Sequence, residues 1–253
     1  MGSPRTNHAP HALERFKRAP DPSRHQLICI AHAGSGASAF AGLAAVAPPD
    51  LDVVALRLPG RESRFAEPPK RHLGAVVDDL VEAVAQATPG RYAIFGQCSG
   101  AFLAIELARH LADATGRSPE VVFAASQEPP LEPADAELEP DVPAYVRLLV
   151  DRGELHSDLA ENDDYMEMFE NVIAADLAWT RSYAAAAPHP PIMTRLVSLC
   201  GASEDPGVLA SQDGWAQLTD GPFATVRVEG GHFLTSASPD HLMRALVDQI
   251  EAR

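Results

Sequence analysis

A cysteine flanked by two glycines is the feature of this sequence best suited to catalysis. The apolar run Tyr92–Phe95 leads into Gly96-Gln97-Cys98-Ser99-Gly100, and a helical pattern begins at Ala101. This order predicts a strand, a sharp turn and a helix, in which the central residue has a strained backbone and needs tiny neighbours two positions away. The helix N-terminus would stabilise a thiolate and an incoming oxyanion. Cys98 is therefore the candidate nucleophile.

Two further interpretations of the same stretch remain open. Cys98 could be a buried cysteine at the end of a strand, which is a common position for a cytosolic cysteine. Ser99 could be the nucleophile, but a shift by one residue takes it off the apex of the turn and removes the symmetric glycines.

A thiol nucleophile needs a base, and the base needs an orienting acid. In sheets of this kind the active groups follow the strands, in the chain order nucleophile, acid, histidine. Asp205 and His232 meet both demands, since each comes directly after an expected strand. Glu204 and Asp213 compete with Asp205, because an Asp-Pro pair often only starts a helix, and His241 is the other histidine in the right order.

Two backbone N–H groups are expected to form an oxyanion hole. One belongs to Ser99, which follows the nucleophile, and the other to Ala33 in the loop after the first strand. The glycines of the run Ala33-Gly34-Ser35-Gly36 allow the backbone to approach a substrate closely, although an ordinary strand-to-helix turn also explains them.

The elements that must position these residues alternate between short apolar strands and helices. This alternation predicts an α/β fold with a mostly parallel sheet and right-handed crossovers. The expected strands are 26–31, 52–56, the strand before Cys98, 121–126, 194–200 and 223–228. The expected helices are 39–47, 72–87, 101–111, 144–152, 165–183, one through Trp215 and Leu218, and 239–251.

The alternation is interrupted once, and we expect one domain over residues 26–253 with an inserted helical lid at about 128–190. Within that insertion, the acidic, proline-rich part 131–141 is interpreted as a solvated linker. Residues 1–25, rich in Pro, His and Arg, are interpreted as a poorly ordered leader with a short helix near Leu13–Phe16.

Composition excludes several classes of function. A formal net charge of -15 argues against a nucleic-acid partner, and no apolar run is long enough to span a membrane or to serve as a secretion signal. Three widely spaced cysteines, with Cys29 and Cys200 inside apolar runs, fit a reducing cytosol rather than a disulfide framework. We expect a cytoplasmic monomer without a metal site.

Several motifs in order resemble those of type II thioesterases, the free-standing α/β-hydrolases of polyketide and nonribosomal peptide pathways. The motifs are Leu27–Gly34, Leu58–Arg61, the turn at Cys98, Gly201–Pro206, Trp215 and Gly230–Leu234. The resemblance implies an α/β-hydrolase fold, a helical lid, and a substrate tethered as a thioester to the phosphopantetheine arm of a carrier protein. It implies no cofactor of the enzyme's own.

The sequence departs from the family at three places. The family has serine where Cys98 stands, proline where Ala31 stands, and Arg-Ala-Asp where Ala174-Ala175-Asp176 stands. With a cysteine, the acyl-enzyme is itself a thioester, so transfer to a second carrier thiol is open beside hydrolysis; a few relatives with this turn are aminoacyl shuttles. Dienelactone hydrolases share the turn but not the other motifs. A binding module that has lost catalysis predicts a broken triad, whereas all three positions are filled.

A carrier protein is usually acidic, so docking on this acidic chain requires local positive charge. Five cations cluster in one short segment near the expected active edge: Arg57, Arg61, Arg64, Lys70 and Arg71. We expect this segment to be the docking patch, although a solvated charged loop would have the same composition.

Overall fold

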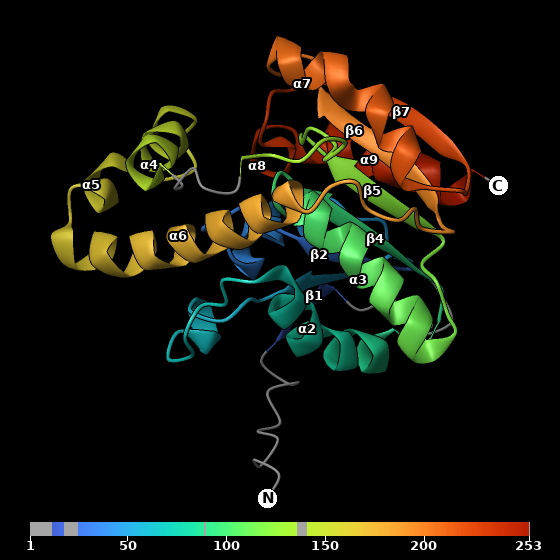
Figure 1. Cartoon of the computed structure of the whole chain (residues 1–253), viewed down its shortest axis with the longest axis horizontal. Coiled ribbons are helices and arrows are strands. Elements are labelled where there is room, and N and C mark those ends of the chain that lie inside the picture. The colour runs from blue at the N-terminus through green and yellow to red at the C-terminus, as the bar shows by residue number, and fades with distance from the viewer. Residues whose placement is uncertain (1–11, 18–24, 89, 136–140, 253) are drawn as a thin grey trace, which may run out of the picture.

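A seven-stranded sheet forms the centre of the molecule, as the computed structural model shows for residues 12–17, 25–88, 90–135 and 141–252 (Figure 1). The spatial order is β1-β3-β2-β4-β5-β6-β7, and all neighbours pair in parallel except β1 with β3. The strands are β1 (Leu13–Lys17), β2 (Gln26–Ile30), β3 (Asp52–Leu56), β4 (Tyr92–Gln97), β5 (Val121–Ala125), β6 (Arg195–Gly201) and β7 (Phe223–Val228). The mostly parallel sheet predicted from the sequence is thereby confirmed.

Helices cover both faces of the sheet, which explains why its central strands are continuous apolar runs without polar alternation. One face packs on α2 (Leu73–Ala87), α3 (Gly100–Thr115) and the end of α6 (Asp163–Ala185). The other face packs on α1 (Ala41–Ala45), α8 (Leu234–Ala237) and α9 (Pro239–Glu251). The remaining short elements near the strand ends are η2 (Ala37–Phe40), η3 (Glu62–Arg64), α7 (Pro206–Ser211) and η4 (Gln212–Leu218).

Three helices lie between β5 and β6 in the chain, where the sequence predicted an insertion. They are α4 (Val142–Asp151), α5 (Ser157–Ala160) and the long α6, and in Figure 1 α4 and α5 lie at the end of α6 that projects beyond the sheet. Asp141 and Asn162 cap α4 and α6 by accepting backbone N–H bonds, which fixes where each helix begins. A separate small core, built around Ile173 and Phe233, joins this insertion to the loop after β7.

The N-terminal prediction needs a correction. Leu13–Lys17 is not a short helix but an edge strand, antiparallel to β3, so these residues belong to the sheet and not to a loose leader. Apolar Leu13 packs against the same core as α2 and α3. The pairing of this strand with β3 depends on a distant segment of the chain, so no pattern within the strand's own residues predicts it. Residues 1–11 and 18–24 of the proposed leader lie outside the described residues.

The turn between β4 and α3 has the strained geometry that the glycine spacing predicted. Cys98 has a φ of 54°, a left-handed conformation that costs a non-glycine residue about 1–3 kcal/mol. The Cys98 N–H donates to the carbonyl of Ala125 at 2.8 Å, which ties the apex to the neighbouring strand. A Cβ on Gly96 would overlap the backbone of Gly100, and one on Gly100 would lie 2.6 Å from the carbonyl oxygen of Ile30. Both glycines are therefore required by the packing of backbone against backbone.

Within the described part of the chain, none of the helices has the length and apolar character needed to cross a bilayer.

Replacing Gly96 with alanine should disrupt this turn. Because the new methyl group meets backbone rather than a movable side chain, we expect Gly96→Ala to lower the free energy of unfolding in urea by about 3 kcal/mol. Gly74→Ala is the matched control: Gly74 lies in α2 with open space around it, so the substitution should stabilise the protein by about 0.5–1 kcal/mol. Equal stability of the two variants would contradict the close packing described here.

Candidate active site

Cys98, His232 and Glu204 come together above the ends of β4, β6 and β7. The imidazole of His232 lies close enough to Cys98 on one side for the two side chains to interact. Its Nδ1 lies 3.1 Å from both carboxylate oxygens of Glu204 on the other. A thiol in contact with an imidazole that is in turn oriented by a carboxylate is the arrangement of a nucleophile, base and acid.

The charges around His232 favour its protonated form. Although burial opposes a charged imidazole, the hydrogen bonds to Cys98 and Glu204 raise the pKa of His232 to about 10. Glu204 is buried, yet the same contact with His232 lowers the pKa of its carboxyl. The site is therefore built to hold a proton on His232.

In the structure the acid that orients His232 is Glu204 and not Asp205, the residue expected from the sequence. Asp205 is the N-cap of α7, and its carboxylate accepts the Gly207 N–H at 2.8 Å instead of contacting His232. Asp-Pro as a helix start was the competing interpretation, and it holds here. Glu204, the residue before Asp205, occupies the position at the imidazole because its side chain turns inward from the end of β6.

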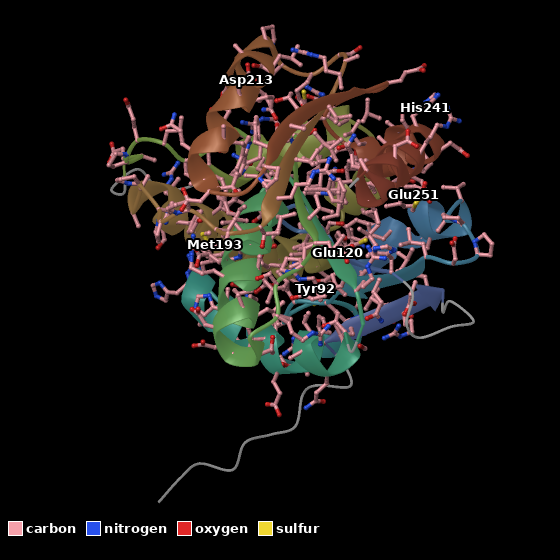
Figure 2. All side chains as sticks on the ribbon, turned by 90° about the vertical axis from the view of Figure 1, so that its right-hand side faces the viewer. Tyr92, Glu120, Met193, Asp213, His241 and Glu251 are labelled. Carbon is pink, nitrogen blue, oxygen red and sulfur yellow. The ribbon has the colours of Figure 1, made fainter. Side chains whose placement is uncertain are left out.

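His241 and Asp213, whose positions in the sequence also suit a base and an acid, lie away from the nucleophile. Figure 2 shows both at the periphery of the molecule. His241 lies 3.4 Å from Glu229 on the outer side of α9, and Asp213 accepts a hydrogen bond from Thr225 at 3.0 Å. Neither contacts Cys98 in the described structure.

The two residues expected to supply the oxyanion hole lie beside the nucleophile. The carbonyls at the end of β2 press against Gly100, so the loop that carries Ala33 meets the N-terminus of α3, where Ser99 is the N-cap. Tyr145 of α4 links the two segments, since its hydroxyl contacts Cys98 and donates to the Ala33 carbonyl at 3.3 Å. Burial raises the pKa of Tyr145, which keeps that hydroxyl protonated; no sequence motif pointed to this residue.

Asp176 of α6 braces the Ala33 loop from the other side. This almost fully buried carboxylate accepts the backbone N–H of Gly34 at 2.8 Å and forms a bidentate ion pair with Arg61, at 2.8 and 2.9 Å. Arg61 also donates to the Ser35 carbonyl at 2.8 Å. The insertion is therefore fixed to the loop that carries the candidate oxyanion hole.

The prediction that three arginines belong to a carrier-docking patch is wrong. Arg57, Arg61 and Arg64 are buried, and each is neutralised by carboxylates. Arg57 pairs with Glu14 and Glu62, Arg61 with Asp176, and Arg64 with Glu67 and Asp79. They hold loops together because burying an unpaired guanidinium is costly. Lys70 and Arg71 are not buried and remain accessible.

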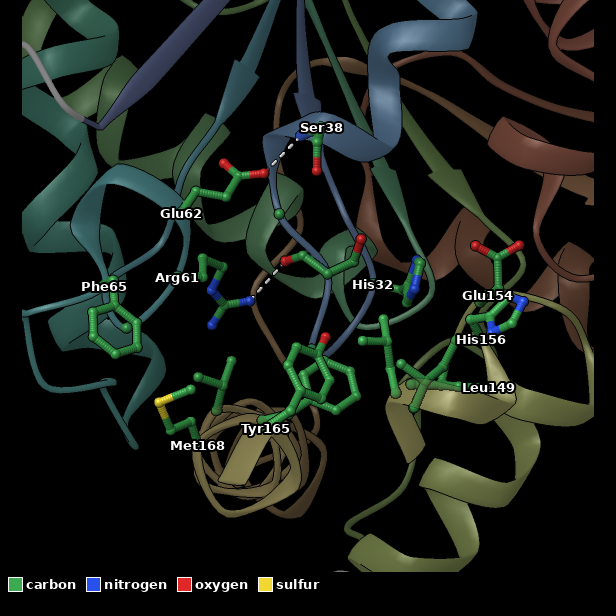
Figure 3. A pocket seen from close by; sticks show the side chains of 18 residues that line it. His32, Ser38, Arg61, Glu62, Phe65, Leu149, Glu154, His156, Tyr165 and Met168 are labelled. Carbon is green, nitrogen blue, oxygen red and sulfur yellow. Dashed lines mark hydrogen bonds between the residues drawn. The ribbon is translucent and has the colours of Figure 1, made fainter. Parts of the chain in front are cut away.

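Two cavities lie near Cys98, His232 and Glu204. One, of about 360 Å³, lies between the loops after β2 and β3 and the helical insertion, and is shown in Figure 3. Its wall includes His32 and Glu154, both close enough to His232 to influence or respond to its charge. The other, of about 580 Å³, lies between α4, α6 and the segment after β5, and Tyr145 lines it. The first cavity thus reaches the loop that carries Ala33, and the second reaches Tyr145, which contacts Cys98.

The described residues contain no cluster of three or more His, Cys, Asp or Glu side chains that could hold a metal ion.

The thioesterase domain family model matches residues 25–253, which is most of the chain. The chain belongs to the thioesterase family. The α/β-hydrolase fold expected from the sequence is therefore confirmed, and with it the resemblance to thioesterases.

Relatives of this thioesterase come from biosynthetic and fatty-acid systems. It is 28% identical to thioesterase PikA5 of Streptomyces venezuelae, over 87% of this chain and 79% of that protein. It is 29% identical to the human medium-chain S-acyl fatty acid synthase thioesterase, over 82% of this chain and 80% of that protein. Among solved structures, the type II thioesterase BorB of the borrelidin cluster has a TM-score of 0.78 at 25% identity, with 94% of this chain and 97% of BorB covered. RedJ of the Streptomyces coelicolor prodiginine pathway has a TM-score of 0.76 at 27% identity, with 92% and 87% covered.

The neighbouring acids 204 and 205 allow a matched test of the triad. Glu204→Gln removes the carboxylate from His232, and we expect the rate of thioester turnover to fall about 100-fold. Asp205→Asn should keep the rate within about twofold, since asparagine caps a helix as well as aspartate does. Equal losses in the two variants would contradict the assignment of Glu204.

The pH profile gives a second readout of the same change. Because the hydrogen bond that His232 donates to Glu204 helps to raise the pKa of His232 to about 10, loss of the carboxylate should lower that pKa. In Glu204→Gln the alkaline decline of the acylation rate, measured in single-turnover experiments, should therefore move to lower pH. If the alkaline decline stays at the same pH in Glu204→Gln, Glu204 does not influence the protonation of the His232 imidazole.

Proposed function

We propose that this protein is a type II thioesterase of a polyketide or nonribosomal peptide pathway, acting on acyl or aminoacyl groups carried on the phosphopantetheine arm of a carrier protein. The observation that carries the proposal is the chain of contacts Cys98–His232–Glu204 at a strained turn in a chain of the thioesterase family. BorB, a type II thioesterase of the borrelidin biosynthetic cluster, and RedJ, a thioesterase of the prodiginine biosynthetic pathway, support the substrate class.

Acylation begins with attack of the Cys98 sulfur on the thioester carbonyl. The C–S bond forms, the carbonyl π electrons move to oxygen, and the N–H groups of Ala33 and Ser99 stabilise the resulting oxyanion. When the oxyanion collapses, the bond to the pantetheine sulfur breaks and His232 gives that sulfur a proton. The products are free pantetheine thiol and an acyl group on Cys98.

Deacylation uses the imidazole in the opposite direction. His232, now neutral, removes a proton from a water molecule that attacks the acyl-Cys98 carbonyl. Collapse of the second oxyanion releases the carboxylic acid and returns the proton to the sulfur–imidazole pair. Glu204 keeps the proton-bearing Nδ1 oriented through both steps, so Nε2 faces the reacting atoms.

The sulfur at position 98 favours a second reaction, acyl or aminoacyl transfer between carriers. An acyl group on a serine is an oxoester, lower in energy than the thioester it came from, so its return to a thiol is unfavourable. An acyl group on Cys98 is a thioester, close in energy to acyl-pantetheine, so a second carrier thiol can accept it. Hydrolysis competes wherever His232 can activate water.

The proposed partner is an acyl or peptidyl carrier protein, and the proposed reaction needs no cofactor of the enzyme's own. Of the five cations expected to bind the carrier, Lys70 and Arg71 stay as docking candidates because they are not buried. The three buried arginines are excluded from that role by their ion pairs.

Intact-mass analysis tests the covalent intermediate. Mixed with an acyl-carrier thioester, the wild-type protein should gain the mass of one acyl group, whereas Cys98→Ala should gain none. With a second, free carrier present, acyl appearing on that carrier before free acid indicates transfer, and prompt free acid indicates hydrolysis. Full turnover by Cys98→Ala would overturn the proposal.

The nucleophile exchange tests the energetic argument. Cys98→Ser, if it retains activity, should shift the products toward free acid, because its oxoester intermediate can no longer return the acyl group readily to a thiol. The measurement is the ratio of acyl-carrier to free acid formed from the same donor. The same ratio in the serine variant and the wild type would count against the argument.

A further inference from the structure

Glu154 is a carboxylate in the wall of the smaller cavity for which the proposed catalytic steps have no use. It lies just after α4, and Figure 3 shows it at the same end of the cavity as His32 and His156. Its side chain is partly buried and accepts a hydrogen bond from the hydroxyl of Ser236. It is close enough to His232 for their charges to interact.

No cation of the described structure lies within ion-pair distance of Glu154. Arg61, in the same cavity wall, is neutralised by Asp176, and Glu62 is neutralised by Arg57. Burial lowers the pKa of His32 to about 3, so that imidazole is neutral. His156 lies 3.6 Å from Asp158, and Arg152 is exposed and forms no ion pair with Glu154.

The catalytic groups compensate Glu154 only in part. The protonated imidazole of His232 hydrogen-bonds to Glu204 and also acts on Glu154, so one cation faces two carboxylates in a partly enclosed site. Burial outweighs both the hydrogen bond from Ser236 and the charge of His232, and it raises the pKa of Glu154.

We infer that Glu154 recognises a positively charged ammonium group on the acyl chain, so that the preferred substrates of Cys98 are aminoacyl rather than plain acyl thioesters. The inference rests on the proposed function and narrows its substrate class. An ammonium group in the cavity completes this partial compensation and donates a charge-assisted hydrogen bond to the carboxylate. The carboxylate would discriminate against an acyl chain of the same shape that ends in a methyl group, because the carboxylate then loses water without gaining a partner.

The test compares pairs of pantetheine thioesters that differ only in the charged group. The pairs are glycyl with propionyl, β-alanyl with butyryl, and 4-aminobutyryl with pentanoyl. The ammonium group lies further from the carbonyl in each successive pair, so the pair with the strongest preference reports the distance between the carbonyl and the ammonium site. For at least one pair, kcat/KM should favour the ammonium member about 10-fold or more. In Glu154→Gln the ratio within that pair should fall about 10-fold, and Glu154→Asp should restore part of it.

Glu132→Gln is the matched control, because Glu132 lines the other cavity. Glu132→Gln should leave the ratio of kcat/KM within the pair unchanged. A loss of the ammonium preference in Glu132→Gln alone would overturn the inference, because it would show that the acyl group binds in the cavity lined by Glu132. Equal losses for charged and neutral thioesters in Glu154→Gln would also overturn it, since Glu154 would then act on pantetheine or on His232. Turnover of neutral thioesters without any ammonium preference would refute this inference while leaving the proposed function intact.

Discussion

The site depends on one steric constraint, the contact of backbone with backbone at the turn that carries Cys98. Gly96 and Gly100 have no side chains, so α3 can start directly against the end of β2, where a Cβ on Gly100 would lie only 2.6 and 2.7 Å from the Ile30 and Ala31 carbonyl oxygens. This closeness lifts the sulfur of Cys98 above the sheet. It also brings the loop after β2 to the same point, so the turn that exposes the nucleophile sets the position of the Ala33 backbone as well.

Buried ion pairs fix the positions of the other loops around the site. Asp176 reaches from the helical insertion to Gly34 and Arg61, so a single carboxylate connects α6 to two loops of the sheet domain. Arg64 makes the same kind of connection between the loop after β3 and α2 through Asp79. Each pair costs desolvation and repays it only in this geometry, which favours one arrangement of the loops around the cavity.

The helical insertion contributes chemistry as well as cover. Tyr145 of α4 contacts both the nucleophile and the Ala33 carbonyl, and Glu154, just beyond the same helix, lies within electrostatic reach of His232. A change in the position of α4 therefore changes the polarity at the nucleophile and the charge in the cavity together. This coupling gives the insertion a direct means of selecting substrates.

Local patterns in the sequence determined the order of strands and helices, the turn at Cys98 and the histidine after the last strand, because each depends on neighbours only a few residues away. The sequence could not decide between adjacent acids: only the direction of the backbone after β6 turns Glu204 inward and leaves Asp205 to cap a helix. Nor could it distinguish a surface patch from buried pairs, since Arg61 and Arg64 are neutralised by Asp176 and Asp79 from other parts of the chain. The sequence shows which residues are charged. The partner and the exposure of each charged side chain depend on long-range packing, so only the tertiary structure decided them.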